Sequence, residues 1–245
     1  MIGALQGRKV LVTGGSRGIG RAVVTELVKA GAYVGFTYVK SSEESASLVR
    51  SMGGRAVSYQ ADTRDMERME EVAQDLYLKQ GASPLRGLVV NAGIYKRSSF
   101  ADLSRDDWKR TLEVNLDGAY NAVKACLPHM EEASIVMVSS QLAHRGSGHG
   151  SDYSASKAGL LGLARSLAKD LAPGIRVNTV SPGYVDTDIL AGDTPEKRAS
   201  RESKVPLGRI GKPVEMAAPI AFFLSDDSSY ITGADLDING GLYVH

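Results

Sequence analysis

The sequence contains little of what several common protein classes require. It has a single cysteine, Cys126, which excludes an intrachain disulfide and a cysteine-based zinc site. No apolar run approaches the roughly 18 residues that a membrane span needs. There is no charge surplus, because 29 Lys+Arg stand against 28 Asp+Glu, whereas a nucleic-acid-binding domain shows clustered basic residues. We therefore expect no membrane and no nucleic acid among the partners.

The amino-terminal residues MIGALQGRKVLVTGG lack the apolar core and the cleavage site of a secretory signal. Together with the single cysteine, this favours a cytoplasmic protein. The 245 residues are 43% hydrophobic and 23% charged, an ordinary globular composition with enough apolar mass for a sizeable core. Glycine is abundant, at 27 residues, and it clusters at informative places.

Short apolar, β-branched runs alternate with segments of helical periodicity along the whole chain. Buried strands that alternate strictly with helices predict an α/β fold, a doubly wound parallel seven-stranded sheet with helices on both faces, in one domain spanning residues 1–245. The predicted strands are Lys9–Thr13, Tyr33–Tyr38, Arg55–Gln60, Gly87–Val90, Ser134–Ser139, Ile175–Val180 and Asp235–Ile238. The predicted helices are Ala22–Ala30, Met66–Leu78, Ser104–Met130, Tyr153–Leu171 and Pro213–Leu224. The polar segment 186–211 is either a long surface loop or a substrate lid.

The first predicted strand ends in a glycine-rich turn, T-G-x-x-x-G-x-G, which leads directly into the first helix. Glycines at this place let the backbone approach a pyrophosphate, whose charge lies at the helix amino terminus. A tight turn without a ligand is the alternative. The turn lacks the Lys-Ser/Thr ending of a P-loop, which disfavours nucleotide hydrolysis. The candidate cofactor-binding residues here are Gly14, Ser16, Arg17, Gly18, Ile19 and Gly20.

Two further strand ends favour a bound nucleotide. Asp62 and Thr63 follow the third strand, where a carboxylate could accept a hydrogen bond from an adenine amino group, although Asp62 could instead cap the next helix. Asn91-Ala92-Gly93 follows the fourth strand, where small residues keep the crevice open and Asn91 could equally be a turn residue.

Ser140, Tyr153 and Lys157 form a candidate catalytic group. Tyr153 and Lys157 are four residues apart on a predicted helix and project from the same face. Tyrosine has an ordinary pKa of about 10, so we expect the neighbouring ammonium to lower it; a shift of about 3 requires roughly 4 kcal/mol. Ser140 ends the fifth strand and can donate a hydrogen bond to a substrate oxygen. His144, His149 and Asp152 lie between Ser140 and Tyr153 without a metal-ligand spacing, so we expect no metal site.

Taken together, these motifs resemble those of the short-chain dehydrogenase/reductase family, in order and spacing over essentially the whole chain. The resemblance implies a Rossmann-type sheet and hydride transfer between a nicotinamide and a carbonyl or alcohol carbon. It implies that Tyr153 is the general acid/base, that Ser140 polarises the substrate oxygen, and that Lys157 holds the nicotinamide ribose. Asn115 resembles the asparagine that anchors a proton-relay water. Pro182, Gly183, Val185 and Thr187 resemble the segment that contacts the nicotinamide. A homotetramer is also implied.

The substrate class follows from a narrower resemblance. Val205–Arg209, Ser229–Gly233 and Asn239–Gly241 are similar to the matching parts of 3-oxoacyl-[acyl-carrier-protein] reductases, which makes an acyl-thioester reductase the first expectation. Those reductases often carry basic residues before the fifth strand, where this chain has Glu131 and Glu132. Carrier-protein docking therefore stays open, and a dehydrogenase or reductase of sugars, polyols or other small carbonyls is the alternative. A non-catalytic dinucleotide-binding regulator is a third possibility.

The end of the second strand indicates which cofactor is used. NAD-specific enzymes usually carry an acidic residue there, which accepts hydrogen bonds from the ribose hydroxyls and would repel a 2′-phosphate. In this chain Thr37 stands at that position and Lys40 follows it. Arg17 of the glycine turn resembles the basic residue of NADP-dependent members, and a guanidinium can hold a phosphate bidentately. We therefore expect NADP(H) to be preferred over NAD(H).

Overall fold

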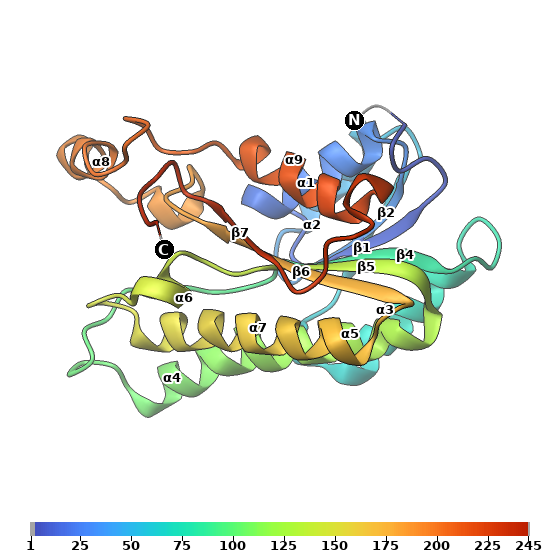
Figure 1. Cartoon of the computed structure of the whole chain (residues 1–245), viewed down its shortest axis with the longest axis horizontal. Coiled ribbons are helices and arrows are strands. Elements are labelled where there is room, and N and C mark those ends of the chain that lie inside the picture. The colour runs from blue at the N-terminus through green and yellow to red at the C-terminus, as the bar shows by residue number, and fades with distance from the viewer. Residues whose placement is uncertain (1–2, 245) are drawn as a thin grey trace.

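The computed structural model describes residues 3–244. Its centre is one seven-stranded sheet in which all neighbouring strands are parallel, in the order β3-β2-β1-β4-β5-β6-β7 (Figure 1). All seven predicted strands are present. Their bounds are β1 Lys9–Val12, β2 Tyr33–Tyr38, β3 Ala56–Gln60, β4 Leu85–Val90, β5 Met130–Val138, β6 Ile175–Pro182 and β7 Asp235–Ile238.

Helices cover both faces of this sheet, which confirms the doubly wound, Rossmann-type fold (Figure 1). One face carries α1 (Gly18–Lys29), α2 (Ser42–Ser51) and α9 (Pro213–Leu224); the other carries α3 (Met66–Leu78), α5 (Gly118–Cys126) and α7 (Ser151–Asp170). Within residues 3–244, no helix combines the length and the hydropathy of a membrane-spanning segment.

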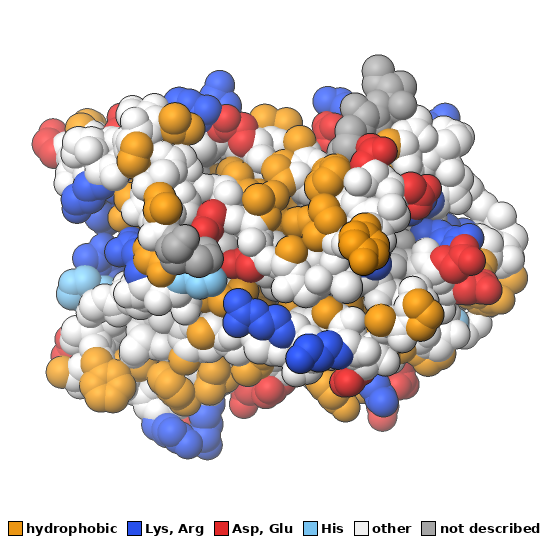
Figure 2. Space-filling view, in the orientation of Figure 1, with side chains coloured by type: hydrophobic (Ala, Val, Ile, Leu, Met, Phe, Trp, Pro, Cys, Tyr) orange, Lys and Arg blue, Asp and Glu red, His pale blue; other side chains and the backbone are white. Residues whose placement is uncertain are grey.

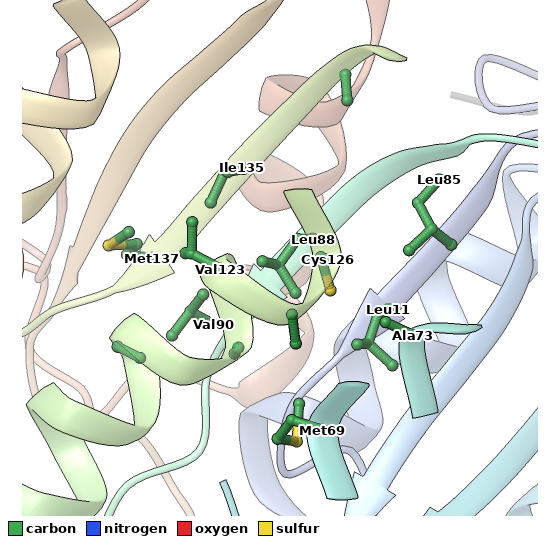
Figure 3. Packing of buried hydrophobic residues seen from close by; sticks show 14 of the residues in the cluster. Leu11, Met69, Ala73, Leu85, Leu88, Val90, Val123, Cys126, Ile135 and Met137 are labelled. Atoms are coloured by element: carbon green, nitrogen blue, oxygen red, sulfur yellow. The ribbon is translucent and has the colours of Figure 1, made fainter. Parts of the chain in front are cut away.

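Each face has its own apolar cluster, because side chains on successive strand residues point to opposite sides. Figure 3 shows Leu11, Leu88 and Ile135 of three neighbouring strands meeting side chains of α3 and α5, among them Cys126. Cys126 is fully buried, and burial raises the pKa of its thiol to about 12. This cysteine is therefore a small hydrophobic residue of the core.

One predicted helix, Ser104–Met130, is wrong as a single element. The structure divides it into α4 (Arg105–Leu112), a π-helical turn (113–117), α5 and a short 3-10 turn (127–129), and Met130 already begins β5. The apolar periodicity continues across the π turn, so it could not reveal the break. Pro128, in the 3-10 turn, marks the carboxyl-terminal end of the helix.

Helices α2, α6 (Leu142–Arg145) and α8 (Pro195–Glu202) were not predicted. Helix α8 lies inside the polar segment 186–211, which also contains a 3-10 turn at 188–190. The base of this segment is closed by a parallel bridge between Val185 and Gly211. Further along, the Leu207 N–H donates to the Gly240 carbonyl at 3.1 Å. The segment is therefore structured and attached to the carboxyl-terminal turn.

Candidate active site

The predicted site residues converge at one edge of the sheet. Parallel strands all end at the same edge, and a crevice opens where neighbouring connections leave to opposite faces. In this sheet that place lies between β1 and β4. The glycine turn follows β1, Asn91 follows β4, Ser140 follows β5 and Pro182 ends β6. The fold thus gathers segments from distant parts of the chain around one crevice.

The glycine turn requires glycine at specific positions. Gly14 has φ +67° and Gly18 has φ +54°, both in the left-handed region that glycine adopts most readily. A Cβ atom on Gly20 would lie 2.1 Å from the carbonyl oxygen of Gly14, so no side chain fits there. Ser16 is buried, and helix α1 begins at Gly18. The turn therefore presents the amino terminus of α1 to the crevice.

Asn91 and Ala92 fix this turn from the end of β4. The backbone N–H groups of Asn91 and Ala92 donate to Thr13 Oγ1 at 2.9 and 3.0 Å. The Asn91 amide nitrogen donates to the carbonyls of Thr13 and Gly14, both at 3.0 Å. Asn91 is thus the residue that joins two strand ends, rather than only a turn residue.

Thr37 lies near the end of β2 as predicted, but its side chain does not face the crevice. Its side chain is 1% exposed, and its hydroxyl oxygen accepts a hydrogen bond from the Gly14 N–H at 3.1 Å. Its carbonyl accepts from the Gly15 N–H at 2.9 Å. Thr37 therefore stabilises the glycine turn by these two hydrogen bonds and does not present its side chain to a ribose.

The two basic residues beside the turn are exposed. Arg17 forms an ion pair with Asp188 of the 186–211 segment at 3.1 Å, with the two side chains 70% and 66% exposed. Lys40 is exposed two residues beyond the end of β2. The Arg17–Asp188 pair connects the cofactor turn to the segment that was proposed as a lid.

Asp62 and Thr63 lie beyond the end of β3. Asp62 forms an ion pair with Arg64 at 2.7 Å, and hydrogen bonds from Arg64 hold the pKa of that carboxyl below its usual range. The cap of α3 is Asp65, which accepts from the Arg68 N–H, so Asp62 does not fill that role. Thr63 is buried.

Ser140, Tyr153 and Lys157 are brought together by β5 and α7. Ser140 is 7% exposed, and its Oγ accepts from the Leu142 N–H at 3.1 Å. The Lys157 ammonium lies 5.7 Å from the centre of the Tyr153 ring and donates to the Val138 carbonyl at 2.7 Å. All three side chains thus line one end of the crevice.

The structure contradicts the expectation that Lys157 lowers the pKa of Tyr153. Burial raises the pKa of Tyr153 to about 12, while a hydrogen bond with Ser140 acts in the opposite direction and Tyr95 adds to the rise. Burial also lowers the pKa of Lys157 to about 8. Desolvation disfavours both charged forms, and Lys157 is not among the groups that shift the pKa of Tyr153.

Asn115 lies in the π-helical turn, which directs it toward the same crevice. Its Oδ1 accepts from the Ile94 N–H at 2.8 Å, and its Nδ2 donates to the Ile94 carbonyl and to Ser156 Oγ, both at 3.0 Å. A Cβ atom on Gly93 would lie 3.2 Å from Asn115 Oδ1 and 3.4 Å from Lys157 Nζ. Glycine at position 93 therefore leaves space between these two polar groups.

Tyr95 is a site residue that the sequence analysis missed. Its ring centre is 4.8 Å from that of Tyr153, and its hydroxyl donates to the His149 carbonyl at 3.0 Å. A Cβ atom on Gly150 would lie 2.6 Å from the Tyr95 ring. The available signal was an aromatic residue two positions after Gly93.

The segment after β6 completes the crevice. The Gln141 N–H donates to the Pro182 carbonyl and the Gly183 N–H to the Ile238 carbonyl, both at 3.0 Å. Thr187 follows Val185, and a Cβ atom on Gly18 would lie 3.3 Å from the Thr187 methyl group. The predicted nicotinamide-contacting segment thus faces the glycine turn directly.

These residues fit a dinucleotide. The glycine turn leaves a side-chain-free approach to the amino terminus of α1, where a pyrophosphate is favoured. Gly93 leaves open space beside Asn115 and Lys157, at the opposite end of the crevice. The Arg17 side chain, in the glycine turn, and Lys40, just beyond β2, are both exposed to solvent.

Comparisons with known proteins agree with this geometry. Residues 14–243 match the family model described as "Enoyl-(Acyl carrier protein) reductase". The chain is 40% identical to the L-rhamnose 1-dehydrogenase (NAD(P)(+)) of Azotobacter vinelandii, over 97% of each chain. It is 37% identical to the 3-oxoacyl-[acyl-carrier-protein] reductase FabG of Thermotoga maritima, over 98% of this chain and 99% of that one. A blue fluorescent protein from a metagenomic library, solved in complex with NADPH, superposes with a TM-score of 0.92 at 35% identity, covering 98% of this chain and 100% of that one.

Proposed function

The chain belongs to the short-chain dehydrogenase/reductase family, and we propose that it is an NADP(H)-preferring reductase of 3-oxoacyl thioesters. Family membership makes it an NAD(P)-dependent oxidoreductase that acts on CH–OH and C=O groups. The nicotinamide supplies or accepts the hydride. The thioester substrate and the preference for NADP(H) are the proposed parts.

In this proposal Ser140 donates a hydrogen bond to the substrate oxygen and Tyr153 transfers a proton to it. The hydrogen bond between Ser140 and the phenol supports this pairing, because one oxygen atom can contact both groups. Lys157 holds the nicotinamide ribose with its buried ammonium. Asn115 anchors a water beside Lys157, in the space that Gly93 leaves open.

The preference for NADP(H) rests on charge. No carboxylate occurs from the start of β2 up to Glu43, while Arg17 and Lys40 are exposed. A 2′-phosphate would form charge-assisted hydrogen bonds with the Arg17 guanidinium, displacing Asp188. The NADPH held by the metagenomic relative supports the same choice.

The proposal of an acyl substrate rests on exposed apolar residues of the 186–211 segment. We propose that this segment is a substrate lid. Ile189 is 58% exposed and Leu207 is 69% exposed. Ile189 follows Asp188 directly, next to the residue that contacts the glycine turn. Exposed apolar side chains on a segment that contacts the glycine turn suit an acyl chain, which would cover them.

Sugars and polyols are the second candidate, favoured by charge at the start of β5. Glu131 and Glu132 are exposed there, and the Glu132 carboxylate pairs with Arg86 at 2.8 Å. Two carboxylates raise the cost of docking an acidic carrier protein. We therefore expect a thioester of a small carrier to be used at least as well as one on a carrier protein. The 40% identical rhamnose dehydrogenase also supports the sugar alternative.

A homotetramer and a cytoplasmic location are further parts of the proposal. Hydrophobic side chains gather over α9 and β7 in Figure 2. Val214, Tyr230 and Leu236, in and between these elements, are among the exposed large hydrophobic residues. β7 is the last strand of the sheet, so its free edge could pair with a second copy. Light scattering at micromolar concentration tests this, and a strictly monomeric mass would contradict it.

The decisive assay follows the absorbance of NADPH with acetoacetyl-CoA and longer 3-oxoacyl-CoA esters. In parallel, NADP+ is supplied with L-rhamnose, other aldoses and polyols. We expect kcat/KM to be highest for the thioesters. Exclusive turnover of sugars would replace the first candidate by the second, and no turnover of any carbonyl or alcohol would favour a non-catalytic binding protein.

A further inference from the structure

A cluster of possible metal ligands lies behind the catalytic serine. His144 belongs to α6, the short helix that follows Ser140, and it faces β7, whose Asp235 and Asp237 are two residues apart on one side of the strand. The His144 Nε2 atom lies 2.7 Å from Asp235 Oδ2. One ligand atom from each of the three residues lies within 4.8 Å of the others.

The charge of this cluster favours a cation. Asp235 has a side chain only 7% exposed. Its hydrogen-bond partners are the hydroxyls of Thr179 and Ser181 and the imidazole of His144; among the described residues, no lysine or arginine pairs with it. The Asp237 carboxylate lies close by and is also partly buried. Two partly buried carboxylates this near each other repel, and a divalent cation between them would relieve that repulsion.

The donor set favours a borderline divalent metal. His144 stacks on Tyr243 with ring centres 5.7 Å apart and an interplanar angle of 14°, which fixes the direction of its Nε2 atom. Imidazole with carboxylates suits Zn²⁺, Co²⁺ or Ni²⁺, whereas Mg²⁺ and Ca²⁺ prefer oxygen ligands alone. Ligands bound at about 2.0–2.2 Å from one ion lie at most about 4.4 Å apart, so small rotations of the side chains would close the cluster.

We propose that His144, Asp235 and Asp237 bind one Zn²⁺-like divalent ion. Ser181 Oγ, 3.4 Å from His144 Nε2, is close enough to serve as a further oxygen ligand. The ion connects the turn after the catalytic serine to the last strand of the sheet. Its role is structural, because the cluster lies on β7 and α6 and uses none of the residues assigned to proton transfer. From the sequence we predict no metal and weigh His144 only with His149 and Asp152; the structure instead joins His144 to β7.

The test uses the full chain without a polyhistidine tag, after treatment with EDTA. Titration with Co²⁺ is followed by its visible absorption, and titration with Zn²⁺ by calorimetry. We expect one ion per chain with micromolar or tighter affinity, and a midpoint of thermal unfolding raised by several degrees with Zn²⁺ but not with Mg²⁺. Absence of binding at 100-fold molar excess (about 1 mM metal for about 10 µM protein) would overturn the proposal and leave a hydrogen-bonded His–Asp pair.

Variants locate the ion. His144→Ala removes the only nitrogen ligand and should weaken Zn²⁺ binding at least about 30-fold. His149→Ala is the matched control, because His149 is exposed in the same loop and outside the cluster. Asp237→Asn provides a second, nearly isosteric variant should His144→Ala fail to fold, and it should also abolish the Zn²⁺-dependent rise in melting temperature. Unchanged binding in both His144→Ala and Asp237→Asn would place the ion elsewhere and refute the site.

Discussion

The glycine turn after β1 and the catalytic group on β5 and α7 reach their positions by different means. The turn is held by neutral hydrogen bonds: Thr37 accepts from Gly14, and Asn91 donates to the carbonyls of Thr13 and Gly14. These bonds are complete without any ligand. The catalytic group instead depends on two ionisable side chains, Tyr153 and Lys157, whose charged forms burial disfavours.

This difference shows which half of the site is preformed. A backbone turn fixed by uncharged groups buries no charge, so it carries no cost of desolvating a charge. Tyr153 and Lys157 do carry such a cost, and the Lys157 ammonium donates to the Val138 carbonyl. Tyr153 and Lys157 therefore need opposite charges or hydrogen-bond partners beside them to stabilise their charged forms.

The largest effect is expected from Tyr153→Phe, which removes the proton-transferring hydroxyl and keeps the ring. We expect kcat to fall at least about 10²-fold while the KM for NADPH changes by less than about threefold. Steady-state kinetics on the best substrate measures both. Tyr95→Phe is the control, because it keeps the ring next to Tyr153 and loses only the bond to the His149 carbonyl. A near wild-type rate for Tyr153→Phe would exclude this tyrosine as the acid/base.

Lys157→Met tests the cost of the buried ammonium. Lowering the pKa from 10.5 to about 8 corresponds to roughly 3 kcal/mol of destabilisation near neutral pH, from which about 1 kcal/mol for the lost bond to Val138 is subtracted. The variant should be inactive, and its free energy of unfolding at pH 7 should exceed that of the wild type by about 2 kcal/mol.

The gain in unfolding free energy of Lys157→Met depends on pH because the pKa of Lys157 is lowered in the folded protein. Between pH 8 and about 10 the unfolded wild type keeps a proton on Lys157 that the folded protein has released, so wild-type stability rises with pH. The raised pKa of Tyr153 lowers stability only above about pH 10. Urea unfolding from pH 7 to 10 should therefore show the advantage of Lys157→Met disappearing. Lys40→Met, at an exposed lysine, should show no such trend, and a constant difference for Lys157→Met would contradict the assigned burial effect.

The preformed half of the site could largely be predicted from the sequence. Strand–turn–helix order and glycine spacing are local, so the positions of β1, the glycine turn and α1 follow from neighbouring residues. Thr37 shows what such local patterns do not predict. Its place at the end of β2 was predicted correctly, but its hydroxyl bonds to Gly14 instead of facing the crevice. Which way a short side chain turns depends on packing that no local pattern encodes.

The catalytic half depended more on tertiary contacts. The i, i+4 spacing of Tyr153 and Lys157 was visible, but their pKa values reflect burial by segments distant in sequence. The π-helical turn that directs Asn115 interrupts a continuous apolar periodicity and could not be predicted from it. His144 and Asp235 are 91 residues apart, and only the parallel order of β6 and β7 brings them into contact.

Arg17→Ser tests the ion pair that the glycine turn forms with Asp188. We expect kcat/KM with NADPH to fall about tenfold and with NADH to change less than about twofold, because an exposed guanidinium–phosphate contact contributes near the lower end of 1.5–3 kcal/mol. Arg21→Ser, one turn further along α1 and exposed, is the control. Equal losses with both cofactors would mean that Arg17 does not recognise the 2′-phosphate.

Asp188→Asn should have the smallest effect. Asp188 pairs with Arg17 at 3.1 Å, and both side chains are more than half exposed, so the pair is worth less than about 1 kcal/mol. A 2′-phosphate must compete with this carboxylate for the guanidinium. Removing the charge should therefore lower the KM for NADPH by about two- to threefold at low ionic strength and leave the KM for NADH unchanged. The gain should vanish at high salt, where the exposed charges are screened.

In an Arg17→Ser background Asp188→Asn should do nothing, because the two substitutions act on one contact. An effect of Asp188→Asn that persists without Arg17 would show that the segment influences the cofactor by another route, and the link between the glycine turn and the lid would then not depend on this ion pair.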